Sequence, residues 1–117
     1  MARLTDPEKL NCFKNALANW RYEGFIILTD VAFEWAKLHL PGFTPRWLGR
    51  LMNDHLRGGG EIDQQKETRP EWNVHSFHYD LRFYIGGRLI YLETRLIYDE
   101  PDDPDNPVIH VVNIHEA

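Results

Sequence analysis

The stretch HSFHYDLRFYIGGRLIYLETRLI, residues 75 to 97, decides the fold of this chain. Apolar and polar residues alternate through it, which is typical of β-strands that bury one face. Gly86 and Gly87 interrupt the alternation, and a Gly-Gly pair between two such runs favours a two-residue hairpin turn. The sequence therefore predicts an antiparallel hairpin on either side of this turn.

The turn also predicts which residues face each other, because in a two-residue hairpin residue 85 lies opposite residue 88. This register gathers the apolar side chains on one side, with Leu81, Phe83, Ile90, Leu92 and Leu96 as core residues. The other side, which we call the polar face, holds His78, Asp80, Arg82, Tyr91, Glu93 and Arg95. A last strand, VIHVVNIH at residues 108 to 115, adds Asn113 and His115 if its odd positions join that side.

The first half of the chain predicts three helices, each with a capping residue at its start and a breaker at its end. The first runs from Asp6-Pro7 to Gly24, the second from Thr29 or Asp30 to Pro41-Gly42, and the third from Thr44-Pro45 to Gly58. Helices followed by strands indicate an α+β class. We expect one domain, residues 1–117, with three N-terminal helices packed on one face of an antiparallel β-sheet.

Composition excludes several classes of protein. A hydrophobic content of 43% and four Trp residues argue against intrinsic disorder. Cys12 is the single cysteine, so no internal disulfide forms. No segment resembles a signal peptide or a bilayer span, so a cytoplasmic location without a membrane partner is expected.

The net charge of −5 is unevenly distributed. Residues 1–60 carry eight Lys and Arg against six Asp and Glu, whereas residues 61–117 carry five against twelve. Five of those acids lie in the segment 99–105, which its prolines and aspartates indicate to be a solvated turn. The acidic balance works against phosphate binding in general.

Motifs for metals and cofactors are missing, so none is expected. His75 and His78 point to opposite faces of a strand and do not form a ligand pair. The acidic segment lacks the order of an EF-hand loop, and residues 57–61 lack the Gly-Lys-Ser/Thr of a phosphate loop.

The polar face has two interpretations. Antiparallel sheets commonly leave one face in water, where ion pairs across strands contribute little. Alternatively, His, Tyr and Arg are the groups suited to moving protons and stabilising negative charge during catalysis. A histidine titrates near pH 6.5, so it can hold or release a proton at neutral pH.

The order of elements resembles the MqsR branch of the RelE-like bacterial toxins, which are messenger-RNA endonucleases. The stripe Leu48, Leu51, Met52 and Leu56, then HYDLRF, the Gly turn, LIYLETRLI and VVNIHEA carry this resemblance. It implies a RelE-like fold, a metal-independent endoribonuclease or an inactive relative, RNA as substrate and a cognate antitoxin as partner. Two family positions that usually hold Lys or Gln hold His here.

The resemblance implies site residues as well. Tyr91 matches the family's catalytic Tyr, His78 lies near its catalytic Gln, and His115 stands where a Lys is usual. Lys66 or Gln65 corresponds to the catalytic Lys of the first strand. Together with the chemistry of the polar face, this gives His78, Tyr91 and His115 as catalytic candidates, with His78 and His115 as acid and base. The substrate-binding candidates are Arg82, Arg95, Lys66 and Gln65.

A DNA-binding module is the alternative. Residues 29–56 can form a helix-turn-helix, with Arg46, Trp47 and Arg50 on a recognition helix at residues 44–56 and residues 61–85 as a wing. This hypothesis gives the polar face no role, which is why the nuclease hypothesis is preferred.

Overall fold

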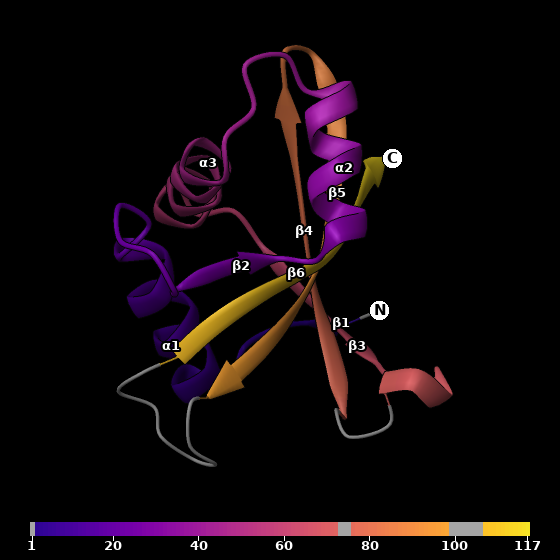
Figure 1. Ribbon diagram of the computed structural model, residues 1–117. Coiled ribbons are helices and arrows are strands. Elements are labelled where there is room, and N and C mark those ends of the chain that lie inside the picture. Colours follow the sequence, from indigo (N-terminus) through magenta and orange to yellow (C-terminus); the bar gives the residue numbers. More distant parts are fainter. Residues whose placement is uncertain (1, 73–75, 99–106) are drawn as a thin grey trace.

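The computed structural model describes residues 2–72, 76–98 and 107–117, and its elements confirm the predicted α+β class (Figure 1). The acidic segment 99–105 and His75 lie outside the described residues. The helices are α1 (Pro7–Ala18), α2 (Asp30–His39) and α3 (Pro45–Arg57), with a short 3₁₀ turn, η1 (Pro70–Trp72). The strands are β1 (Ala2–Arg3), β2 (Ile26–Leu28), β3 (Ile62–Lys66), β4 (Phe77–Ile85), β5 (Arg88–Tyr98) and β6 (Pro107–Glu116). No described helix has the length and apolarity that crossing a bilayer demands.

The predicted hairpin forms between β4 and β5, and its register is confirmed. Gly86 and Gly87 adopt φ values of 58° and 80°, the left-handed conformation that the tight turn requires. Leu81 faces Leu92 and Arg82 faces Tyr91. Of the predicted core, Leu81, Ile90 and Leu92 are fully buried, and Phe83 and Leu96 pack against that core while partly buried.

The sheet is mixed, which corrects the prediction of an antiparallel sheet. Its six strands lie in the order β1-β3-β4-β5-β6-β2. β2 runs parallel to β6, with Ile26 opposite Ile109, and the two ribbons lie side by side in Figure 1. An apolar run as short as residues 25–28 does not show from the sequence whether it is a strand, or which strand it pairs with.

A β-bulge divides β6. Asn113 faces Glu93 and His115 faces Tyr91, as the sequence predicts, but Val111 faces Thr94 after a shift in register. The extra residue turns the odd positions of the earlier half of β6 toward the core, where Ile109 and Val111 are fully buried. The alternation in this strand therefore changes phase at the bulge.

All three predicted helix starts are confirmed by their capping bonds. The side chains of Asp6, Thr29 and Thr44 accept hydrogen bonds from the backbone N–H groups of Glu8, Ala32 and Trp47. The first helix is shorter than predicted, because Asn19 ends it five residues before Gly24. The Asn19 side-chain amide donates to the carbonyl of Asn15 at 2.8 Å, which satisfies an open carbonyl of the last turn.

The core joins the helices to one row of sheet residues. Phe13 and Leu17 of α1, Ala32 and Ala36 of α2, and Leu48 and Met52 of α3 are all fully buried. They share one cluster with Leu81, Leu92 and Ile114 of the central strands. The polar face consists of the residues that alternate with these, so it lies on the other side of the same strands.

Candidate active site on the polar face

Three side chains form a row across the middle of the sheet. Arg82 on β4 faces Tyr91 on β5, and Tyr91 faces His115 on β6. The rings of Tyr91 and His115 stack with their centroids 4.6 Å apart and an interplanar angle of 23°. We call Arg82, Tyr91 and His115 the outer row. It brings a cation, a phenol and an exposed imidazole to neighbouring strands.

Asp80 links the outer row to His78. Its carboxylate accepts a hydrogen bond from the Tyr91 hydroxyl through one oxygen, and its other oxygen lies 2.8 Å from Nδ1 of His78. An ionised carboxylate only accepts hydrogen bonds, so Nδ1 of His78 is the donor in this contact. His78, Asp80, Tyr91 and His115 therefore form one continuous chain of contacts.

The environment of Tyr91 keeps its hydroxyl protonated. Burial raises the pKa of Tyr91 far above its ordinary value, and the hydrogen bond to Asp80 raises this pKa further. The phenol is therefore a fixed donor to Asp80 at any physiological pH. A phenol held in this way contacts Asp80 through its hydroxyl and the His115 ring through its face.

Arg82 carries a permanent positive charge that is partly compensated. Its guanidinium pairs with Asp63 of β3, and this hydrogen bond raises the pKa of Arg82 above its ordinary value. The Arg82 side chain keeps 39% of its surface exposed. A phosphate can reach it from solvent, but has to compete with the Asp63 carboxylate.

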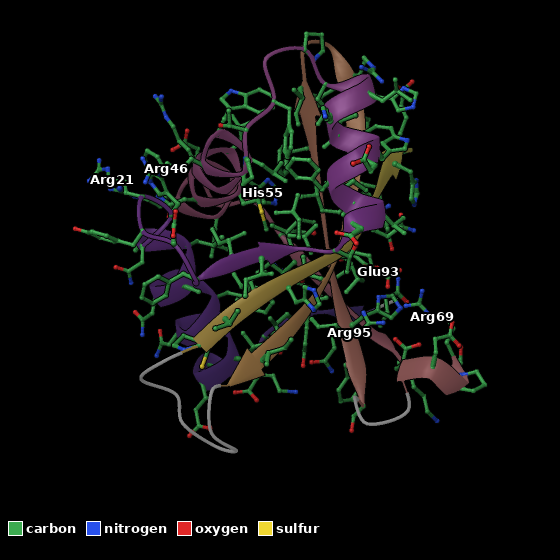
Figure 2. All side chains as sticks on the ribbon, in the orientation of Figure 1. Arg21, Arg46, His55, Arg69, Glu93 and Arg95 are labelled. Carbon is green, nitrogen blue, oxygen red and sulfur yellow. The ribbon has the colours of Figure 1, made fainter. Side chains whose placement is uncertain are left out.

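A second group of charges lies beside the outer row, and three of its four side chains are buried while that of Arg69 keeps 37% of its surface exposed. Arg95 pairs with Glu67 and with Glu93, and Arg69 pairs with the same two carboxylates (Figure 2). The hydrogen bond from Arg69 and the charge of Arg95 lower the pKa of Glu67 to about 2. We call Glu67, Arg69, Glu93 and Arg95 the ion network. Buried charges persist only when they are paired in this way.

The structure separates the predicted site residues into different places. Arg95 is fully buried in the ion network, so it offers no surface for substrate. Gln65 faces His78 on the polar face, whereas Lys66 faces Phe77 and belongs to the alternate side of β3. His78 precedes Arg82 by four residues on one strand, about 13 Å at about 3.3 Å per residue. The backbone positions of His78 and Arg82 are therefore well separated, and His78 is connected to the outer row through Asp80 and the Tyr91 hydroxyl.

Three residues matter here that the sequence did not single out as site residues. Asp80 is 1% exposed and holds both His78 and Tyr91, although the alternation showed only that it lies on the polar face. Glu67 and Arg69 come from the segment between β3 and η1. An irregular segment has no periodicity, so no sequence signal pointed to either side chain.

The residues proposed for DNA binding lie on α3, with Arg46 visible at the left of Figure 2. Arg46 and Arg50 are exposed, and Arg50 lies 3.9 Å from Asp54 one turn later on the same helix. Trp47 is partly buried and packs against the core. Only the two arginines of this set therefore face solvent for contact with a nucleic acid.

The described residues form no cluster suited to a metal ion, and the comparisons identify no related protein. Among residues 2–72, 76–98 and 107–117, no group of three or more His, Cys, Asp or Glu side chains is arranged to hold a metal ion. Comparison of the chain with protein-family models, with curated proteins and with solved structures gave no match.

Proposed function

We propose that the polar face cleaves RNA without a metal ion, and that the outer row is its reacting centre. The observation that carries this proposal is the stack of Tyr91 on His115 beside Arg82 in one row across three strands. An imidazole that transfers a proton and a guanidinium that stabilises negative charge are the two groups that phosphodiester cleavage needs most.

The proposed reaction uses the 2′-hydroxyl of the RNA itself. His115 accepts the 2′-hydroxyl proton as the 2′-oxygen attacks phosphorus, and Arg82 stabilises the charge that gathers on the phosphate oxygens. The bond from phosphorus to the 5′-oxygen then breaks, and that oxygen takes a proton from solvent, to which the row is open. The products are a 2′,3′-cyclic phosphate and a 5′-hydroxyl.

Asp80, Tyr91 and His78 support this centre in the proposed mechanism. The Tyr91 ring holds the imidazole of His115 by stacking, and Asp80 holds Tyr91 through its hydroxyl. His78 fixes Asp80 from the other end of the chain of contacts. This assigns His78 a positioning role in place of the direct acid or base role expected from the sequence.

The resemblance to RelE-like toxins supports the same activity. It extends the proposal to a toxin of the RelE and MqsR type with RNA as substrate and an antitoxin as partner. In that family a Lys of the first strand acts on the substrate. Lys66 faces away from the polar face here, so the proposed mechanism gives it no part.

The test is cleavage of end-labelled single-stranded RNA in the presence of EDTA. We expect the wild-type protein to produce 2′,3′-cyclic phosphate ends. His115→Ala and Arg82→Ala should each lose about 10²- to 10⁴-fold in rate, because each removes a group that acts on the reacting atoms. His78→Ala should lose less than either. Asp63→Asn should lower KM, because it frees the Arg82 guanidinium for phosphate.

Controls separate this activity from a loss of folding and from DNA binding. His39→Ala removes an exposed histidine of α2 and should leave the rate unchanged, and circular dichroism should show the same fold for every variant. A parallel arm measures binding of duplex DNA by Arg46→Ala and Arg50→Ala. Absence of RNA cleavage in the wild type, together with duplex binding that both variants weaken, would replace the nuclease proposal with the helix-turn-helix alternative.

A further inference from the structure

A cleft opens between α1 and α3, on the helical side of the sheet. Its volume is about 390 Å³, within the range of small-molecule sites. α1 contributes one wall and α3 the other, and Trp20 and Arg21, which follow α1, also line the cleft. The residues that line it are Lys14, Asn15, Ala18, Trp20, Arg21, Asn53, Leu56 and Arg57.

The charge of the cleft has one sign. Lys14, Arg21 and Arg57 are exposed at its rim, and the described residues that line it include no Asp or Glu. The Arg21 guanidinium lies 5.0 Å from the ring centre of Trp20, a cation–π contact that holds its charge at the cleft. A rim of this kind on a chain of net charge −5 concentrates positive potential at one place.

Asn53 is the independent observation that points to a ligand. This residue is only 8% exposed and lines the cleft. Among the described residues its side-chain amide has no protein hydrogen-bond partner, and its polar atoms are not among those closed to solvent, so the amide opens into the cleft. The donors and the acceptor of this amide are therefore available to a group bound in the cleft. An amide that both donates and accepts, placed beside Trp20 and Leu56, matches the edge and faces of a nucleobase.

We propose that this cleft binds a nucleotide unit, an aromatic base with its adjoining phosphate. The Asn53 amide bonds the edge of the base, Trp20 and Leu56 pack against the base, and Lys14, Arg21 and Arg57 hold the phosphate. The unit has two sources, a free nucleoside monophosphate or one nucleotide of a single-stranded RNA.

This site is separate from the polar face. α1 and α3 place Leu17 and Met52 in the core on the side of Leu81 and Leu92, opposite the alternating polar residues. Figure 2 shows Arg21 at one side of the molecule and Arg69, Glu93 and Arg95 toward the other. The proposal therefore stands or falls independently of RNA cleavage at the outer row.

Calorimetry tests the site with AMP, CMP, GMP and UMP, and with adenosine and inorganic phosphate as partial ligands. We expect at least one nucleotide to bind more than about 10-fold more tightly than inorganic phosphate or adenosine alone. Arg57→Ala and Asn53→Leu should each weaken that binding about 10-fold, whereas Arg3→Ala, an exposed arginine outside the cleft, should not. Equal affinity for phosphate and nucleotide, or nucleotide binding unchanged in both cleft variants, overturns the proposal.

Urea unfolding distinguishes a loss of binding from a loss of folding in the Asn53 variant. Leu fills the space of Asn53, whose amide makes no hydrogen bond to the described protein, so Asn53→Leu should not lower the urea midpoint of unfolding although it weakens nucleotide binding about 10-fold. A lower midpoint overturns the proposal, because it shows that the amide has a structural partner.

A hexanucleotide RNA, titrated into His115→Ala so that no substrate is consumed, identifies the source of the nucleotide unit. Tighter binding than the monophosphate, lost in Arg57→Ala, assigns RNA, and equal or weaker binding assigns the free nucleotide.

Discussion

At the scale of single residues, burial separates side chains that the sequence alternation treats alike. Arg82 and Arg95 both lie on the polar face, yet Arg82 reaches solvent and Arg95 is fully buried. The difference arises because the irregular segment after β3 brings Glu67 and Arg69 to this part of the face. There Glu67 pairs with Arg95, and Arg69 pairs with Glu93. The alternation could predict the face of each residue, but not which part of that face another segment covers.

Glu67 gives a prediction in which the sign of the pH dependence follows from its pKa. The folded-state pKa of about 2 lies below the ordinary value of 4.5, so the contribution to stability is complete above pH 4.5 and is lost as the pH falls toward 2. Glu67→Gln should lower the free energy of unfolding by roughly 3 kcal/mol at pH 7 and by little at pH 2. Urea unfolding at both pH values measures this difference.

The control for Glu67 is an exposed carboxylate. Glu34→Gln on α2 removes the same charge from a side chain in solvent and should change the free energy of unfolding by less than about 0.5 kcal/mol at either pH. An equal loss at pH 7 and pH 2 in Glu67→Gln would show that packing, and not the ionised carboxylate, stabilises the ion network.

At the scale of elements, the sequence predicts what is local and misses what is distant. The β4–β5 hairpin follows from Gly86-Gly87 and the alternation around it, which agree on one register. The pairing of β2 with β6 joins segments about eighty residues apart, and no local pattern encodes it. The candidate site lies between these two cases, because the contact of His115 with Tyr91 was predicted only on the assumption that the odd positions of the last strand join the polar face.

Thr29 connects two of these distant elements and supports a second prediction. Its hydroxyl accepts from the N–H of Ala32 at the start of α2 and donates to the carbonyl of Val112 at the bulge of β6. Thr29→Val keeps the shape but removes both bonds, and should lower the free energy of unfolding by about 2 kcal/mol. Thr29→Ser retains the hydroxyl and should lose less than about 1 kcal/mol. Equal losses in urea unfolding would mean that the methyl group, not the hydroxyl, matters.

At the scale of the whole molecule, the sheet separates two surfaces of different chemistry. The polar face holds the ion network and the outer row, and the helices on the other side form the cationic cleft. Composition showed that the positive balance lies in residues 1–60 and the negative balance in residues 61–117. It could not show that helix packing assembles Lys14, Arg21 and Arg57 at one cleft, because that depends on how closely α1 and α3 approach.

Gly49 sets the approach of α3 to the segment that follows α1, and it gives the last prediction. A Cβ at this position would lie 2.8 Å from Ile26 Cδ1 and 3.2 Å from Trp20 Cβ. Overpacking of this kind is destabilising by about 1 to 3 kcal/mol, which exceeds the gain of about 1 kcal/mol that Ala brings to a helix. Gly49→Ala should therefore lower the free energy of unfolding.

Because Gly49 and Glu67 share no partner, the losses in free energy of unfolding from Gly49→Ala and Glu67→Gln should add within about 0.5 kcal/mol in the double variant. A larger deviation in urea unfolding would show that the core couples the two sides of the sheet, and that the cleft and the polar face do not act independently.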